Sequence, residues 1–299
     1  MDERTALRML AGDLPGAGDD AAVVGGTVIT TDMLHESTDF PPGTTRYTAG
    51  WRSVGASLSD VAAMGAEATA AVAAYGAPAF DGDELRAFVR GARGVCDAVG
   101  ATYVGGDLDA HGEFTVATTA IGETDDPVLR TGAEPGDAVC VTGTFGRTAA
   151  ALRFFERGDA ERGNDLFRFE PRVAAGLALR GHASAMMDSS DGLARSLHQL
   201  AEASGCGFAV EWDRVPVDRS VDEVADGGGD RRELAVHFGE DFELVFSLPE
   251  DALDDAREAS PTSIARVGRV TDESRGVTMD GGPLPDRGFT HSRSESERA

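Results

Sequence analysis

The segment from Leu58 to Gly65, which reads LSDVAAMG, places a single carboxylate, Asp60, among small and apolar residues. Apolar side chains recur at helical spacing upstream, from Tyr47 to Val61, and Gly65 is a typical helix stop, so we expect a helix that ends near Gly65. An acid in the last turn of a helix opposes the helix dipole at a cost of about 0.3–1 kcal/mol. Local stability therefore does not account for Asp60. It is either an exposed acid on an acidic chain or a functional carboxylate.

Comparable acids stand in four other segments, which read GDDAAVV from Gly18, VITTDM from Val28, YVGGDLD from Tyr103 and MMDSSDGL from Met186. Gathering such acids is unfavourable without cations, because at about 4 Å and an effective dielectric constant of about 20 each like-charged pair costs on the order of 4 kcal/mol. A divalent ion reverses the sign of that energy. Oxygen ligands without His or Cys suit Mg²⁺, which binds through few carboxylates together with substrate phosphates. The pattern therefore predicts a phosphate site with several magnesium ions.

Composition narrows the class of protein. The 299 residues suffice for two modest domains or one large one. The formal net charge is −25, and since the chain has no lysine, every fixed positive side-chain charge is an arginine. Nucleic acid and anionic lipid would be repelled, and neither is expected as a partner. Strong acidity without lysine is typical of proteins from salt-loving cells. We expect a halophilic protein that loses structure in dilute buffer and recovers it in molar KCl.

The cysteines and the apolar segments indicate a cellular location. Cys96, Cys140 and Cys206 are widely spaced and fit no metal or disulfide framework, which favours a reducing compartment. The first residues, MDERTALRML, lack the features of a signal peptide, and no apolar run is long enough to span a membrane. We therefore expect a cytoplasmic protein.

Strands and helices alternate along the chain, which predicts an α/β or α+β fold. In the first half, strands are expected at 21–24, 28–31, 68–75, 102–104 and 114–121, and an amphipathic helix at 81–99. Asp, Pro and Gly accumulate at 124–136, which divides the chain into domains 1–132 and 133–299. The second domain is expected to have strands at 138–142, 208–212, 242–248 and 264–270, helices at 146–156, 173–179 and 194–203, a charged loop at 159–165 and a flexible loop at 227–229.

Polar residues at expected strand ends are the candidate ligands. Thr30, Thr31 and Asp32 end one strand, where α/β sheets place ligand contacts, although β-propensity alone also explains the threonines. Asp188 and Asp191 flank two serines before a helix. Either Ser190 or Asp191 could simply cap that helix. A cap uses one oxygen, whereas a cation site uses both acids.

The sequence does not match the motifs of several common nucleotide- and metal-binding sites. The glycines at Gly16 and Gly18 imitate a dinucleotide fingerprint but no strand precedes them, and a Walker A loop requires a lysine that the chain lacks. Asp107 begins a calcium-loop pattern whose twelfth position is Thr118 instead of Glu. The six histidines show no zinc spacing.

Eight motifs in a fixed order resemble those of thiamine-monophosphate kinases, in the superfamily of aminoimidazole ribonucleotide synthetase. The series is GDDAA at Gly18, TTD at Thr30, SDVAAMG at Ser59, GGD at Gly105, RTGAEPGD at Arg130, VTGTFG at Val141, DSSDGL at Asp188 and GEDFEL at Gly239. The resemblance implies a two-domain α/β (α+β) fold, with an N-terminal ATP- and magnesium-binding domain that pairs in a homodimer to form a shared β-barrel, and a C-terminal α/β domain.

The same resemblance implies ATP-dependent phosphorylation of thiamine monophosphate to thiamine diphosphate, with ATP as co-substrate and several Mg²⁺ ions. The implied metal ligands are Asp20, Thr30, Thr31, Asp32, Asp60, Asp107, Asp188 and Asp191. Gly106, Asp107, Arg130 and Ser190 would face the nucleotide. Asp39, Glu240 and Phe289 would face thiamine monophosphate, with Phe289 stacking on an aromatic ring.

The chemistry needs no general base or covalent nucleophile. A phosphate monoester, whose second pKa is about 6, is already anionic at neutral pH. The difficulty is to bring it against a triphosphate, and metal ions that bridge both can neutralise the repulsion. We therefore expect direct in-line transfer. The alternatives are another ATP-dependent enzyme of the superfamily, such as an aminoimidazole ribonucleotide synthetase, or a non-catalytic divalent-cation-binding protein.

Overall fold

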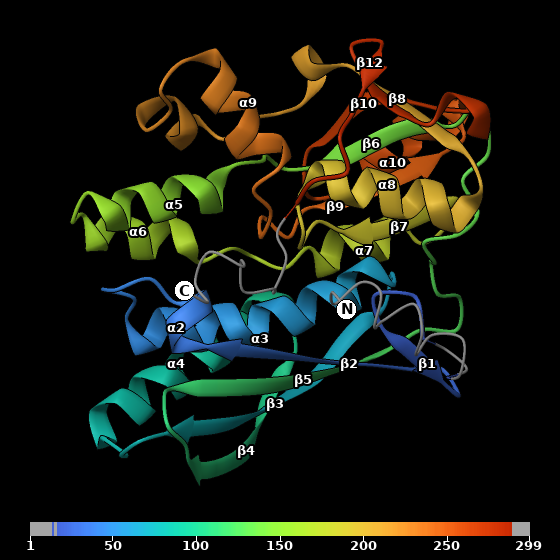
Figure 1. Cartoon of the computed structure of the whole chain (residues 1–299). Helices are drawn as coiled ribbons and strands as arrows, with labels where there is room; N and C mark the ends of the chain where they lie inside the picture. The colour runs from blue at the N-terminus through green and yellow to red at the C-terminus, as the bar shows by residue number, and fades with distance from the viewer. Residues whose placement is uncertain (1–13, 15–16, 289–299) are drawn as a thin grey trace.

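Two separate β-sheets organise the chain, one on each side of the segment 124–137 (Figure 1). The computed structural model describes residue 14 and residues 17–288. The first sheet has five strands in the order β1-β2-β5-β3-β4, in which only β3 and β4 run parallel. The second has seven strands in the order β12-β11-β8-β10-β6-β9-β7, in which only β11 and β8 run parallel. The expected fold, with mixed sheets and helices, is confirmed.

The first unit contains β1 (Ala22–Val24), β2 (Thr27–His35), α2 (Glu36–Asp39), α3 (Arg46–Ala63), β3 (Glu67–Ala77), α4 (Gly82–Val99), β4 (Thr102–Ala110) and β5 (Thr115–Glu123). The second contains β6 (Ala138–Thr142), α5 (Arg147–Glu156), α6 (Ala160–Phe167), α7 (Val173–Leu179), β7 (Ala185–Asp188), α8 (Leu193–Ser204), β8 (Gly207–Val210), α9 (Gly228–Val236), β9 (Leu244–Leu248), α10 (Leu253–Ala259), β10 (Ile264–Thr271), β11 (Val277–Met279) and β12 (Gly282–Pro283).

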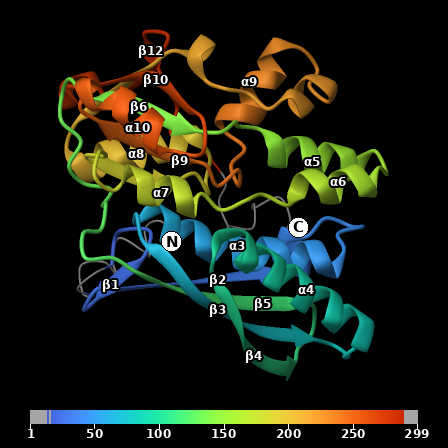
Figure 2. The ribbon, with the colours of Figure 1, turned by 180° about the vertical axis from the view of Figure 1, so that it is seen from behind.

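Helix α3 lies between the first sheet and the second unit, and both views show it there (Figures 1 and 2). Thr45 caps the helix by accepting a hydrogen bond from the Thr48 backbone N–H (3.1 Å). Two glycines let α3 and α4 cross closely: a Cβ on Gly50 would lie 2.1 Å from a backbone oxygen of α4, and one on Gly91 would lie 1.9 Å from a backbone oxygen of α3. Most α3 side chains are consequently buried, with one face toward the sheet and the other toward the second unit.

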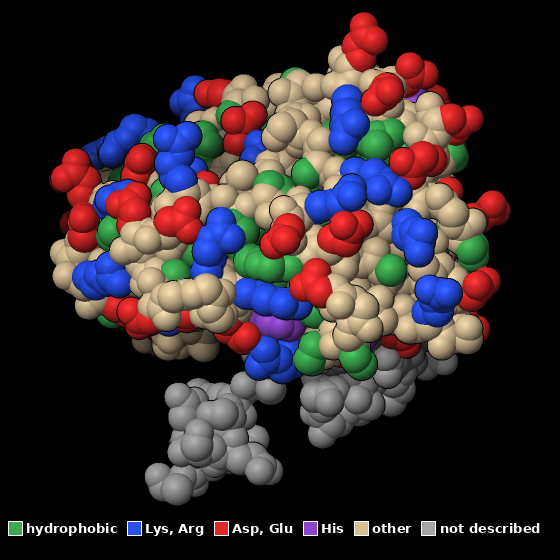
Figure 3. Space-filling view, turned by 90° about the horizontal axis from the view of Figure 1, so that it is seen from above, with side chains coloured by type: hydrophobic (Ala, Val, Ile, Leu, Met, Phe, Trp, Pro, Cys, Tyr) green, Lys and Arg blue, Asp and Glu red, His purple; other side chains and the backbone are tan. Residues whose placement is uncertain are grey.

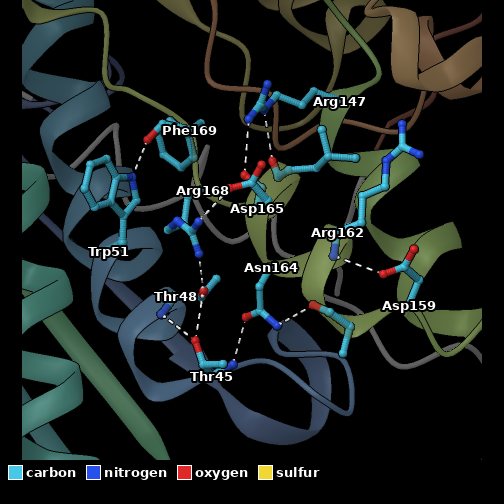
Figure 4. A network of polar contacts seen from close by, with 12 residues as sticks. Thr45, Thr48, Trp51, Arg147, Asp159, Arg162, Asn164, Asp165, Arg168 and Phe169 are labelled. Carbon is cyan, nitrogen blue, oxygen red and sulfur yellow. Dashed lines mark hydrogen bonds and ion pairs between the residues drawn. The ribbon is translucent and has the colours of Figure 1, made fainter.

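Side chains on opposite faces of the second sheet pack into two different apolar cores. On β6 and β9, Cys140 and Phe246 join the apolar core that continues through α7 and α3 to the first sheet, while Val141 and Val245 join the core beneath α8. The first core therefore runs across the junction between the two units. Polar contacts reinforce this junction, since Thr45 donates its N–H to the Asn164 side chain (2.9 Å) and Trp51 donates its ring N–H to the Phe169 carbonyl (Figure 4).

Four expectations about local structure were wrong. β2 continues through Asp32 to His35, and β4 continues through Asp107 to Ala110, so these acids lie within strands. Residues 159–165 form most of α6 instead of a loop, because Asp159 caps the helix and its apolar residues face inward. Two of the three glycines at 227–229 already belong to α9. None of the helices in the described part of the chain has the length and apolar character needed to cross a bilayer.

Candidate active site

Three carboxylates from distant parts of the chain meet where the two units join. Asp20 precedes β1, Asp60 lies in the last turn of α3, and Asp188 ends β7. One oxygen from each side chain lies within 4.8 Å of the others. Three of the predicted metal ligands therefore come together, and the set draws on both units.

Side-chain hydroxyl groups donate hydrogen bonds to two acids of the cluster and to Asp32 beside it. Thr30 Oγ1 donates to Asp60 Oδ2 (2.5 Å), and Ser59 Oγ donates to Asp188 Oδ2 (2.7 Å). Ser57 Oγ donates to Asp32 Oδ2 (2.5 Å). Thr30 and Asp32 share the face of β2 that is turned toward α3, so both lie beside Asp60 as expected.

Sequence reasoning missed the two serines. Ser57 and Ser59 are fully buried and hold acids of β2 and β7 through side chains of α3. The signal was present in the sequence ASLSDV, where two hydroxyls precede Asp60 within one helical turn. A helix interior normally disfavours serine, so a pair of serines beside an acid in an apolar segment indicates a polar partner from another element.

The cluster carries more negative charge than its surroundings balance. Burial raises the pKa of Asp60 well above its usual range, and the charges of Asp32, Asp188 and Asp20 raise it further. Burial, followed by the charge of Asp20, raises the pKa of Asp188 to about 8. Carboxyl groups in this state bind either protons or cations. An oxygen-only donor set of this kind fits Mg²⁺.

One arginine faces these acids. Arg130 donates from Nη2 to Asp20 Oδ1 (2.7 Å) and from Nε to Asp20 Oδ2 (3.3 Å), while its backbone N–H binds Asp19 Oδ2 (3.0 Å). Burial is the largest single effect on the pKa of Arg130 and lowers it, but the charge and hydrogen bonds of Asp20, together with the charges of Asp19 and Asp188, raise this pKa overall. The predicted nucleotide-facing arginine thus lies beside the cluster, bound to one of its members.

Four other predicted residues lie outside the three-carboxylate group. Thr31 points to the opposite face of β2 and donates to the Thr118 carbonyl (2.8 Å). Asp191 is half-buried in the loop after β7, beside Ser190. Gly106 and Asp107 lie on the edge strand β4, three strands from β2 and hence on the order of 14 Å away.

Strand register places Asp107 in one row with Ala74, Ala117 and Met33, on the face of the sheet turned away from α3. Gly106 and Asp107 also line a groove of about 810 Å³ between β4 and α4, which includes Phe88, Val89 and Tyr103. The GGD motif therefore does not reach the acid cluster of its own chain.

Two loops of the second unit connect the cluster to a second cavity. The Glu240 N–H donates to the Ser190 carbonyl (2.6 Å), and the Ser189 N–H donates to the Glu243 carbonyl (2.8 Å). Gly239 makes this close pairing possible, because its φ is +91° and a Cβ there would lie 2.7 Å from the Ser190 carbonyl oxygen. The DSSDGL and GEDFEL motifs thus form one structural element.

Asp39 and Glu240, both predicted to bind the substrate, line the same cavity of about 480 Å³. Asp39 accepts hydrogen bonds from the His35 N–H and the Thr38 hydroxyl (both 2.7 Å). Aromatic and aliphatic side chains complete the wall, namely Phe40, Leu152, Phe167 and Phe238. Phe289, the third predicted substrate residue, lies outside the described residues.

Arg52 was also missed by sequence reasoning. It is 1% exposed, and its guanidinium binds Glu240 at the wall of this cavity. A lone basic residue in the middle of an otherwise small and apolar helix was the available signal.

Comparisons with known proteins agree with this geometry. Two family models match, "AIR synthase related protein, N-terminal domain" over residues 18–124 and "AIR synthase related protein, C-terminal domain" over residues 134–281. The thiamine-monophosphate kinase of Halobacterium salinarum is 65% identical over 97% of this chain and 100% of its own length.

Solved structures are similar over the same extent. The thiamine-monophosphate kinase of Stenotrophomonas maltophilia has a TM-score of 0.79 at 32% identity, over 94% of this chain and 95% of that one. A structure described as AaThiL complexed with AMPPCP and TMP has a TM-score of 0.87 at 25% identity, over 97% of both chains. The chain therefore belongs to the thiamine-monophosphate kinase family and has the two-domain α/β fold of the AIR synthase-related proteins.

Proposed function

We propose that this protein transfers the γ-phosphoryl group of ATP to thiamine monophosphate, with Mg²⁺ as cofactor, and forms thiamine diphosphate. The observation that carries the proposal is the cluster of Asp20, Asp60 and Asp188, which adjoins loops that lead to an acidic, aromatic cavity. The family relationship and the related structure with AMPPCP and TMP support both substrates.

The cavity suits the cationic, aromatic body of thiamine. Its acids are Glu36, Asp39 and Glu240, while Arg46, which also lines it, is held by Glu36 (2.9 Å) and Glu84 (3.4 Å). A positively charged ring is attracted to such a wall, and the phenylalanine side chains offer it aromatic faces. Glu240 then orients the substrate, with its phosphate directed along the paired loops toward the cluster.

Asp20, Asp32, Asp60 and Asp188 would hold Mg²⁺ at the cluster, with Thr30 and Asp191 as further ligands expected from the family. Of the other two expected ligands, Thr31 directs its side chain to the opposite face of β2, and Asp107 would contribute in the site of a second copy. Bound Mg²⁺ supplies charge neutralisation between two phosphate groups that would otherwise repel each other. Ser57, Ser59 and Thr30 keep the carboxylates aimed at one point. Arg130 is placed to leave Asp20 for a phosphate oxygen, and Ser190 to bind the nucleotide.

The transfer is direct and in line. The acceptor phosphate needs no deprotonation near neutral pH, since its second pKa is about 6, and no described histidine borders the cluster or the cavity as defined above. No phosphorylated enzyme should form. Radiolabel from ATP that remains covalently on the protein after acid quenching would contradict this mechanism.

A homodimer supplies the groups that the cluster of one chain lacks. Ile29 and Met33 are 41% and 59% exposed on the sheet face turned away from α3, which supports its coverage by a second copy in a shared barrel. Gly106 and Asp107 would then serve the partner's site, with the β4/α4 groove beside them taking the nucleoside. Mixing inactive Asp60→Asn and Asp107→Asn proteins should restore part of the turnover, and a mixture as inactive as its components would argue against this sharing.

The direct test is incubation with ATP, Mg²⁺ and thiamine monophosphate in molar KCl, with thiamine diphosphate measured by chromatography. We expect product that requires all three components and disappears with excess chelator. Folded protein that makes no thiamine diphosphate under these conditions would refute the proposal. Product formation without any divalent cation would refute the role assigned to the cluster.

A further inference from the structure

A positive charge is enclosed in the junction between the two units. Arg52, in the middle of α3, is 1% exposed, and its donors are directed into the second unit. Nη1 donates to the Phe167 carbonyl (2.8 Å), and Nη2 donates to Glu240 Oε2 (2.7 Å) and more weakly to the Glu240 carbonyl (3.3 Å). The guanidinium carbon lies 3.8 Å from the centre of the Phe167 ring.

Both residues that Arg52 holds line the 480 Å³ cavity, whereas Arg52 itself does not. The arginine is therefore behind the wall and reaches the cavity only through Phe167 and Glu240. A buried guanidinium with a planar fork fixes the direction of its acceptors, because it must keep its hydrogen bonds where water is excluded. One carboxylate oxygen of Glu240 is taken by Arg52, which leaves the other to face a ligand.

The backbone of Glu240 requires such support. Its φ is +59°, in the left-handed region that side chains other than glycine rarely adopt, and Phe242 two residues later has a φ of +53°. The Thr148 hydroxyl donates to the Glu240 carbonyl (2.7 Å), and the Glu240 N–H is bound to Ser190. These contacts fix the main chain. In the described part of the chain, the carboxylate itself is bound by Arg52.

The same face of α3 holds the acid cluster. Ser59, which binds Asp188, lies seven residues after Arg52, so the two side chains project in nearly the same direction about 11 Å apart along the helix axis. The helix thus sets the separation between the wall of the substrate cavity and the acids that would bind metal.

We propose that Arg52 is a positioning residue for substrate recognition: from the first unit, it holds the Glu240 carboxylate of the second unit in the orientation that receives the cationic part of the substrate. This inference rests on the proposed function, and it concerns the affinity for thiamine monophosphate and not the chemistry of transfer.

The test is a double-mutant cycle on Arg52 and Glu240, with steady-state kinetics in molar KCl. Arg52→Met should raise the KM for thiamine monophosphate roughly ten- to a hundredfold, as expected for a lost charge-assisted contact, and leave the KM for ATP nearly unchanged. In a Glu240→Gln background, the same Arg52→Met change should add less than about twofold, because its effect passes through Glu240.

Arg168 provides a matched control. It crosses the same junction, where it donates to the Thr48 hydroxyl of α3 (3.1 Å) and to Asp165 (2.8 Å) (Figure 4). Within the described residues, Glu240 is not among its hydrogen-bond or ion-pair partners. Arg168→Met should leave the KM for thiamine monophosphate unchanged, even where the melting temperature falls. An equal rise of that KM in the Arg168 variant would show that loosening the junction is sufficient and would overturn the proposal.

Two further outcomes would also overturn it: a KM for thiamine monophosphate that Arg52→Met leaves unchanged, or one that rises equally with and without Glu240. If Arg52→Met does not fold, the cycle is run with Arg52→Lys, which keeps the buried charge but not the planar fork, and an unaltered KM would again contradict the role. Wild-type protein that forms no thiamine diphosphate would instead refute the proposed function itself.

Discussion

Two groups of enclosed acids lie close together in this molecule. The protein provides each acid of one group with its own partner but leaves most of the negative charge of the other group unbalanced. In the GEDFEL segment, each acid has its own protein partner: Glu240 binds Arg52 (2.7 Å), Glu243 binds Arg172 (2.6 Å), and Asp241 accepts the backbone N–H groups of Gly146 (2.6 Å) and Thr148 (3.0 Å) at the start of α5. In the cluster of Asp20, Asp60 and Asp188, the ion pair in the described residues is that of Arg130 with Asp20.

The presence or absence of a protein partner distinguishes acids with a structural role from acids that can bind a ligand. A buried carboxylate that the protein neutralises itself stabilises one arrangement of the chain. Carboxylates placed together with hydroxyl groups, and with too little positive charge, raise one another's pKa and favour a cation. On the face seen from above, acids and arginines are interspersed and exposed (Figure 3). The whole chain is acidic, with a formal net charge of −25, but the acids of the cluster differ in being enclosed, where solvent does not screen their repulsion.

The largest difference between the two groups is expected in turnover. Asp60→Asn and Asp188→Asn should each lower kcat by on the order of a thousandfold or more, because a positioned charge in the reaction centre is lost. Both should leave the circular dichroism spectrum intact, since each removes a like-charge repulsion. Near-normal kcat in both variants would show that the cluster is not the reaction centre.

Breaking a neutralised pair should instead affect stability. Arg172→Met leaves Glu243 buried without its partner, which should lower the free energy of unfolding by about 3–5 kcal/mol. Denaturant unfolding in molar KCl measures the loss. Adding Glu243→Gln to Arg172→Met should recover part of the lost free energy of unfolding. If Arg172→Met alone is as stable as the wild type, Glu243 does not depend on its ion pair with Arg172.

Magnesium should raise the melting temperature through the acid cluster and not through the acids of the GEDFEL segment. At an ion concentration one hundred times the dissociation constant, binding stabilises the folded protein by about 2.7 kcal/mol, which raises the melting temperature. Asp60→Asn should abolish most of this rise, whereas Glu243→Gln should keep it. Equal responses in the two variants would mean that magnesium acts on the surface in general.

The smallest effect is expected from pH at Asp241. Burial raises the pKa of Asp241 to about 7, against the lowering effect of the Thr148 and Gly146 N–H groups. The folded protein therefore favours the protonated acid, so this contribution to stability is fully present below about pH 4 and is lost as the pH rises to about 7. Asp241→Asn should remove this pH slope from the melting temperature, whatever its effect on the absolute value. If the melting temperature of Asp241→Asn depends on pH as steeply as that of the wild type, other acids cause the pH dependence.

The sequence predicted the acids of the cluster better than the groups that support them. Asp60 and Asp188 stood out because an acid among small apolar residues has no local reason to be there. The strand that Asp188 ends, β7, was not itself predicted. Arg52 and Ser59 gave weaker signals, because their partners lie more than one hundred residues away, in the other unit. Such partners follow from the packing of α3 against the second unit, which no local pattern reveals.

Local errors had similar causes. The strand from Thr27 runs past Asp32 because Leu34 is buried on the same face as Thr30, a continuation that polar residues obscure in the sequence. The division of the chain near 132/133 remains a prediction, although the two sheets use strands on either side of it.

The central claim is that cations fill the cluster and not the neutralised segment. Crystals grown with Mn²⁺ in place of Mg²⁺ and an unhydrolysable ATP analogue would test it by anomalous diffraction. The account predicts anomalous peaks among Asp20, Asp60 and Asp188, in contact with the nucleotide phosphates, and none beside Asp241 or Glu243. Well-ordered nucleotide with no ion between those three side chains would contradict it.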